Sequence, residues 1–154
     1  RNAQVHSPKD DLSALEGRMD RVLVDAPCTG SGTWRRRPDA KWRLSPDMLE
    51  TRQNEQAAVL EGAARYVRPG GYLVYVTCSV FPEENEHQVY AFGERHAEWE
   101  LLSAGEVWQD LFGFDKPKPW SSDLKCITLT PASTGTDGFF FAVMQRSQDG
   151  GQTL

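Results

Sequence analysis

The chain has 154 residues, of which 39% are hydrophobic and 25% are charged, a composition typical of one folded domain with an apolar core. Its 17 basic and 22 acidic residues give a net charge of −5, which excludes a chain-wide positive field for nucleic acid but not a local basic patch. Because the longest apolar run is too short to cross a bilayer, we expect no membrane partner. Three cysteines are too few for a disulfide scaffold and indicate a reducing, cytoplasmic environment.

The first part of the chain predicts a strand, a loop and a helix. Residues 3–5 give a weak strand signal, and the β-branched run at 21–25 is typical of a buried strand. Proline and glycines then predict a loop over 26–33. Ser45 is suited to cap a helix, whose apolar positions continue to Val67 until a Pro-Gly-Gly sequence ends it.

The middle of the chain repeats this alternation. The run 72–77 is apolar at successive positions, as expected for a strand buried on both faces of a parallel sheet. Pro82 and the acidic residues after it predict the start of a helix that ends near His96, with Val89 and Phe92 on its inner side. Residues 103–125 predict irregular structure.

The end of the chain predicts two late strands at 126–130 and 139–144, forming an antiparallel pair, followed by a polar tail over 147–154. The order of elements indicates an α/β sheet with right-handed crossovers. One helix joins the strands at 21–25 and 72–77, so we expect them to be parallel neighbours with their carboxyl ends at one edge, where α/β sheets bind ligands.

Two cysteines follow these strand ends. Asp25 ends the first strand, Cys28 lies three residues further on, and Cys78 ends the second strand. Thiols placed beside a carboxylate predict nucleophilic catalysis, although each cysteine alone is equally compatible with an inert, half-buried thiol. A Cys–His hydrolase using His87 is an alternative. No cysteine or histidine spacing predicts a metal site.

The segment 34–43 is a basic loop flanked by tryptophans. It contains five cations and one anion, and we expect it to bind RNA through these residues: Arg35, Arg36, Arg37, Lys41, Trp42 and Arg43. The alternative is a solvated loop whose arginines pair with nearby acids.

Several other residues have simpler structural interpretations. We expect Trp99, Trp108, Trp120 and the aromatic run 139–141 to pack in the core or at an interface, and Cys126 to be inert. Glu83 and Glu84 are interpreted as charges at a helix N-terminus, and Asp137 as a turn residue.

Taken in order, a series of motifs resembles the Sun/Fmu-type (NOL/NOP/Sun family) RNA (cytosine-5) methyltransferases, from about residue 20 to residue 146. The matching residues are Asp25-Ala26-Pro27-Cys28-Thr29-Gly30-Ser31-Gly32-Thr33, Arg36-Arg37-Pro38-Asp39, Lys41-Trp42, Gln53, Gln56, Pro69-Gly70-Gly71, Tyr75-Val76-Thr77-Cys78-Ser79, Pro82-Glu83-Glu84-Asn85-Glu86 and Gly135-Thr136-Asp137-Gly138-Phe139-Phe140.

The resemblance implies a Rossmann-like class I methyltransferase fold that uses S-adenosylmethionine to methylate cytosine in RNA, in bacteria the small-subunit ribosomal RNA. It implies that Cys78 is the nucleophile that adds to C6 of cytosine and that Cys28 helps to release the product. Asp25 would hydrogen-bond the cytosine ring or the methionine end of the cofactor, and Pro27 would lie in the cofactor site.

The family's glycine-rich cofactor loop would lie before Arg1. We therefore expect residues 1–146 to be the carboxyl-terminal part of a catalytic domain, inactive alone, with an exposed sheet edge that favours self-association. Two alternatives stay open. A DNA cytosine-5 methyltransferase would use the Pro-Cys thiol but lack the Thr-Cys motif, and a non-catalytic RNA-binding module would use the basic loop alone.

Overall fold

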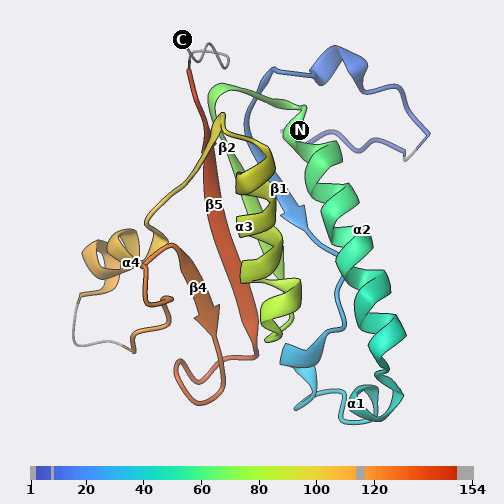
Figure 1. Ribbon diagram of the computed structural model, residues 1–154, viewed down its shortest axis with the longest axis vertical. Coiled ribbons are helices and arrows are strands. Elements are labelled where there is room, and N and C mark those ends of the chain that lie inside the picture. The colour runs from blue at the N-terminus through green and yellow to red at the C-terminus, as the bar shows by residue number, and fades with distance from the viewer. Residues whose placement is uncertain (1–2, 8, 114–116, 149–154) are drawn as a thin grey trace.

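The computed structural model describes residues 3–7, 9–113 and 117–148, and its centre is a five-stranded mixed sheet (Figure 1). The strands are β1 (Met19–Asp25), β2 (Val67–Thr77), β3 (Trp99–Leu101), β4 (Cys126–Leu129) and β5 (Phe139–Arg146). Their order is β1-β2-β5-β3, with β4 pairing to β5. The β1–β2 pair is parallel, as predicted, and β5 is antiparallel to β2, β3 and β4.

The helices are α1 (Ala40–Arg43), α2 (Pro46–Ala64), α3 (Glu86–Arg95) and α4 (Ala104–Phe112). The 3-10 turns Ser13–Leu15, Ser31–Thr33 and Pro82–Glu84 lie in the connections. As predicted, Ser45 caps α2, because its hydroxyl accepts a hydrogen bond from the Met48 amide at 3.3 Å. The prediction that this helix reaches Val67 is wrong: α2 ends at Ala64 and Val67 begins β2, since its side chain is fully buried in the sheet core.

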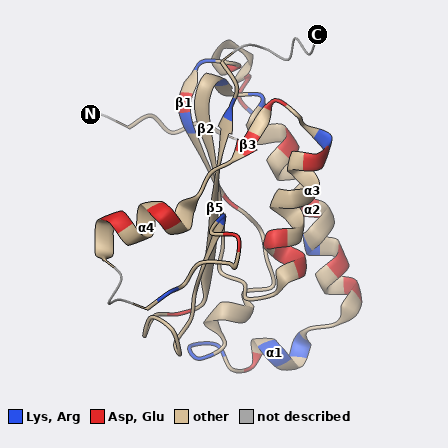
Figure 2. Cartoon of the chain, turned by 60° about the vertical axis from the view of Figure 1, so that its left-hand side comes forward, with Lys and Arg blue, Asp and Glu red and all other residues tan. Residues whose placement is uncertain are grey.

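One face of the sheet is covered by α2 and α3 (Figures 1 and 2). Leu60 of α2 and Val89 and Phe92 of α3 are buried there against alternate residues of the strands, among them Leu73 and Tyr75 of β2. Their burial provides the main hydrophobic stabilisation of the described residues. The helix predicted after Pro82 is confirmed, with a 3-10 turn before it.

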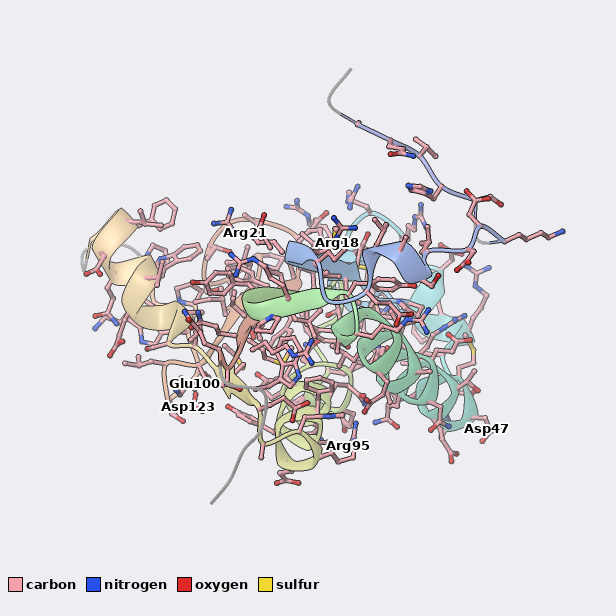
Figure 3. The ribbon with its side chains drawn as sticks, turned by 90° about the horizontal axis from the view of Figure 1, so that it is seen from above. Arg18, Arg21, Asp47, Arg95, Glu100 and Asp123 are labelled. Atoms are coloured by element: carbon pink, nitrogen blue, oxygen red, sulfur yellow. The ribbon has the colours of Figure 1, made fainter. Side chains whose placement is uncertain are left out.

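The opposite face is partly uncovered at β1. Leu23 is 67% exposed, and its neighbours Arg21 and Asp25 on the same face are exposed as well. Figure 3 shows Arg21 and Arg95 on opposite sides of the sheet layer. The prediction that the strand at 21–25 is buried is therefore wrong, because β1 is the edge of the sheet and only its Val24 side faces α2.

The late antiparallel pair is confirmed as β4 and β5. Two other predictions are wrong: residues 3–5 form no strand, and the segment predicted to be irregular contains α4, which packs beside β4. The prediction of a polar tail lies mostly outside the described residues, which end at Gln148. None of the helices in the described ranges is long and apolar enough to span a bilayer.

Candidate active site

The loops after β1 and β2 meet at one end of the sheet. Asp25 pairs in register with Val76, and the Ala26 amide donates to the Val76 carbonyl at 2.9 Å, so both loops begin at the same level. The Gly32 amide then donates to the Cys78 carbonyl at 3.0 Å. Because a Cβ at Gly32 would lie 2.2 Å from the Gly138 carbonyl oxygen, only glycine allows the first loop to pack this closely against the turn before β5.

The two predicted thiols lie in contact. The Sγ atoms of Cys28 and Cys78 are 3.3 Å apart, and both side chains are half-buried. They line a cavity of about 750 Å³, to which Asp25 also contributes. This volume falls within the range of small-molecule and nucleotide sites. The structure therefore brings together all three predicted catalytic residues.

The contact between the thiols separates their acidities. A hydrogen bond from the Cys28 thiol lowers the pKa of Cys78 to about 7, against opposing effects of burial and of the nearby Asp25 and Glu84 carboxylates. The same hydrogen bond, together with burial, raises the pKa of Cys28 far above its ordinary value. Cys78 is therefore the member of the pair that is available as a thiolate near neutral pH, the form that acts as a nucleophile.

A buried carboxylate joins the two cysteine loops. Glu84 is fully buried, and its carboxylate accepts hydrogen bonds from the Thr29 amide at 2.7 Å, the Thr29 hydroxyl at 2.6 Å and the Ser79 hydroxyl at 2.5 Å. The Gln56 amide donates to it as well, at 3.3 Å, and to the Pro27 carbonyl at 2.9 Å. Glu84 does lie in the first turn of a short helix, the 3-10 turn Pro82–Glu84, as interpreted, but its side chain is fully buried and bonded to both cysteine loops, which the sequence did not predict.

Asn85 and Ser31 extend this network. The Asn85 side chain accepts from the Thr77 hydroxyl at 2.6 Å and donates to the Ser79 carbonyl at 3.0 Å. The Ser31 hydroxyl lies 2.9 Å from the Ser79 hydroxyl and accepts from the Val80 amide at 2.9 Å. Sequence reasoning missed this network, although a hydroxyl residue directly follows each cysteine and each hydroxyl requires a partner when buried.

The basic loop borders the same cavity. Arg36, Arg37 and Arg43 line it, whereas Arg35, Lys41 and Trp42 lie outside its lining. Arg52 of α2 is a fourth lining arginine that the sequence analysis did not select. Figure 2 shows basic residues gathered around α1 and acidic residues spread over α2, α3 and α4.

The loop is also partly neutralised. Arg35 and Arg36 pair with Asp137, and Arg43 pairs with Asp39 at 2.7 Å. Asp137, interpreted from the sequence as a turn residue, lies just after the turn and holds the basic loop against the segment before β5. The Lys41 ammonium lies 4.4 Å from the centre of the Trp42 ring, and that ring is 79% exposed. An exposed indole and several guanidinium groups remain available to a ligand.

The other candidates contribute less. Pro27 is half-buried beside the cavity, whose wall it does not form, and its carbonyl is bonded to Gln56. His87 is exposed, unlike the thiols. Cys126 is fully buried, and burial raises its pKa to about 12, as expected for an inert thiol. Within the described ranges, no group of three or more His, Cys, Asp or Glu residues is arranged to hold a metal ion.

Comparison with known proteins identifies relatives of this chain. A family model described as 16S rRNA methyltransferase RsmB/F matches residues 2–145. Ribosomal RNA small subunit methyltransferase B of Erwinia tasmaniensis is 37% identical over 126 residues, which cover 81% of this chain and 26% of that protein. The chain thus spans about a quarter of the length of this curated relative.

Two solved structures have similar folds. The crystal structure of PH0851 superposes with a TM-score of 0.73 at 37% identity, covering 85% of this chain and 27% of the solved chain. The structure of NSun6 from Pyrococcus horikoshii with SFG has a TM-score of 0.62 at 29% identity, covering 82% of this chain and 30% of the other. These likenesses confirm the Rossmann-like methyltransferase fold expected from the motifs. With the family model matching nearly the whole chain, the protein belongs to the 16S rRNA methyltransferase RsmB/F family.

Proposed function

We propose that this chain carries the nucleophile and the RNA-facing surface of an S-adenosylmethionine-dependent RNA (cytosine-5) methyltransferase that acts on small-subunit ribosomal RNA in the cytoplasm. The observation that carries the proposal is the pair of thiols 3.3 Å apart at a cavity, with the pKa of Cys78 lowered to about 7. One pyrimidine ring can contact both sulfur atoms at this separation.

The chemistry requires two thiols with different acidities. C5 of cytosine is a poor nucleophile, and addition of the Cys78 thiolate to C6 makes C5 enamine-like, so that it can accept a methyl group. Asp25 lies on the cavity wall, where its carboxyl can hydrogen-bond N3 and the exocyclic amine as charge develops on the ring. After methylation the C5 proton passes to water, and its electron pair re-forms the C5–C6 double bond as the Cys78 sulfur leaves as a thiolate. Cys28 stays protonated and lies 3.3 Å from that sulfur, where its thiol can donate a hydrogen bond to the departing thiolate.

The cofactor supplies a methyl group on a sulfonium. The residues present fit its methionine end, because Asp25 is exposed at the carboxyl end of β1 and lines the cavity. Pro27 does not line the cavity; its carbonyl, which accepts from Gln56, would hold the loop after Asp25 in place beside the cofactor. The similarity to NSun6 solved with SFG, an analogue of S-adenosylmethionine, supports this assignment.

The RNA would lie across the basic loop. Arg36, Arg37 and Arg43 line the thiol cavity, and Lys41 and Arg35 lie beside them in the same loop. Guanidinium groups bind phosphates, and an exposed indole such as Trp42 can stack on a base that is splayed out of its helix to present C6. Arg52 of α2 also lines the cavity and adds a further cation to this surface.

We further propose that residues 1–146 act as the carboxyl-terminal part of a catalytic domain and transfer no methyl group alone. The free edge of β1 and the 67% exposed Leu23 beside it support this proposal. Expressed alone, the chain is expected to self-associate through this edge. Light scattering tests this expectation: Leu23→Lys should shift the chain toward monomer, and a wild-type monomer at all concentrations would contradict it.

Trapping of a covalent adduct tests the proposed roles. In the intact protein, Cys78→Ala should abolish methyl transfer to RNA, whereas Cys28→Ala should accumulate a denaturation-resistant protein–RNA adduct because elimination fails. Cys126→Ala, a change at a buried thiol away from the cavity, is the matched control and should do neither. An adduct with Cys78→Ala and none with Cys28→Ala would reverse the roles.

The two alternatives give different results in the same preparation. Incorporation of methyl groups into DNA but not RNA would favour a DNA methyltransferase. Retention of all RNA-dependent function after alkylation with iodoacetamide would favour a binding module, because such a module does not use the thiols.

A further inference from the structure

We propose that Glu84 is a positioning residue, which holds the loops after β1 and β2 together so that the sulfur atoms of Cys28 and Cys78 stay in contact. The proposal concerns the thiol pair on which the proposed methyl transfer rests. Its test measures the rate at which the two thiols close to a disulfide and requires no methyl transfer.

The hydrogen bonds of Glu84 lead to both cysteine loops. One carboxylate receives the amide and hydroxyl of Thr29 and the hydroxyl of Ser79. Thr29 directly follows Cys28 and Ser79 directly follows Cys78, so a single side chain fixes the residue next to each thiol. The two loops are about fifty residues apart in sequence.

The hydrogen-bonded groups around Glu84 lie in the interior of the protein. Glu84 and Ser79 are fully buried, and the Tyr75 hydroxyl, which donates to the Glu84 backbone carbonyl at 2.7 Å, is buried as well. A carboxylate without hydrogen-bond donors in such a place would be strongly destabilising. The satisfied network therefore has few alternative arrangements, and a rigid support of this kind is what a site with two reacting atoms requires.

The charge of Glu84 does not favour the Cys78 thiolate. The Glu84 carboxylate raises the pKa of Cys78 and so makes its thiolate less available. If charge were its role, removal of the charge would make Cys78 ionise more readily. The structure instead indicates that the carboxylate is retained as an acceptor for hydrogen bonds, in spite of its charge.

The rate at which Cys28 and Cys78 close to a disulfide reports whether their sulfur atoms stay in contact. In the intact protein, diamide takes two electrons and two protons from the thiols as the Cys28–Cys78 bond forms, and mass spectrometry follows the rate. Glu84→Ala removes every acceptor, and we expect closure to slow by about tenfold or more, since small displacements of reacting groups have large effects on rate. Glu84→Gln keeps the shape, one acceptor oxygen and a polar group toward the hydroxyls, and should stay within about threefold of wild type.

Two controls make the result decisive. Val89→Ala removes methyl groups from a buried side chain of α3. Each variant is measured at the same number of degrees below its own Tm, so that Val89→Ala and Glu84→Ala are equally close to unfolding. Val89→Ala should close the disulfide at the wild-type rate. Glu83→Gln changes the neighbouring charge, which makes none of these bonds, and should also have no effect.

The proposal is overturned if Glu84→Ala closes the disulfide as fast as wild type, if Glu84→Gln and Glu84→Ala change the rate equally, or if Val89→Ala slows closure as much. If Glu84→Ala does not fold, Ser79→Ala replaces it, because that change removes the hydroxyl that joins Glu84 to the Cys78 loop. It should slow closure severalfold, and a wild-type rate would overturn the proposal too.

Discussion

The lowered pKa of Cys78 depends on the thiol beside it, so removal of that thiol has a predictable effect. Cys28→Ala deletes the S–H group that donates to the Cys78 sulfur, the largest effect on the pKa of Cys78. It leaves burial and the Asp25 and Glu84 carboxylates, which raise this pKa, against a smaller lowering by a backbone hydrogen bond. The pKa of Cys78 should therefore rise from about 7 toward its ordinary value of 9.0.

The size of the effect follows from two opposing factors. A pKa of about 7 in place of 9.0 raises the thiolate fraction at neutral pH from about 1% to about 50%. A thiolate whose thiol has a pKa of about 7 is, however, about six- to tenfold less nucleophilic than one whose thiol has a pKa of 9.0, because nucleophilicity falls with the pKa with a Brønsted slope of about 0.4–0.5. At pH 7, alkylation of Cys78 should thus be about five- to eightfold slower in Cys28→Ala than in wild type.

Iodoacetamide labelling, followed by mass spectrometry of the peptides that contain each cysteine, measures this rate as a function of pH. The wild-type midpoint for Cys78 should lie near pH 7 and move up in Cys28→Ala. Cys28→Ser keeps a hydroxyl donor and should retain part of the lowered midpoint. An unchanged midpoint in Cys28→Ala, or wild-type labelling that goes first to Cys28 or Cys126, would refute the reasoning.

Three further predictions concern packing and charge. Gly32→Ala should lower the free energy of unfolding by about 1–3 kcal/mol in urea, since its Cβ would lie 2.2 Å from the Gly138 oxygen. Leu60→Ala should lower it by about 2–5 kcal/mol, and Val107→Ala, at a 56% exposed site, by no more than about 0.5 kcal/mol. Asp137→Asn releases Arg35 and Arg36 to bind phosphate, so RNA affinity should fall more steeply with salt. The slope of the logarithm of the binding constant against the logarithm of the salt concentration should become more negative by about 0.7 for each new phosphate contact. An unchanged slope would show that these arginines do not reach RNA.

The meeting of the two cysteines could be predicted because it depends on chain order alone. One crossover helix between two strands makes them parallel neighbours, and their carboxyl ends then share an edge. The structure then adds the register, in which Asp25 pairs with Val76. Strand burial could not be predicted in the same way, since the exposure of Leu23 depends on what lies beside β1 and not on its own sequence.

Glu84 shows the limit of local reasoning. An acidic pair after a proline usually lies at a solvated helix start, and only contacts with Thr29 and Ser79, distant along the chain, show that one of the two is buried. The helix α4 could have been predicted, because Ala104, Val107 and Leu111 repeat at helical spacing. The glycine and aromatic residues around them made the segment resemble irregular structure.

The segment before β5 links the late strands to the chemistry of the site. The Gly138 amide donates to the Gly32 carbonyl at 2.8 Å, Asp137 pairs with Arg35 and Arg36, and Phe139 lines the thiol cavity. Three adjacent strands thus contribute to the cavity besides the basic loop and α2: β5 contributes its first residue, and β1 and β2 contribute the loops that follow them. Because β5 is antiparallel to β2, its start lies at the same end of the sheet as their carboxyl ends. An antiparallel strand at this position therefore brings a third loop to the site, and changes there act on the basic loop without contact with either thiol.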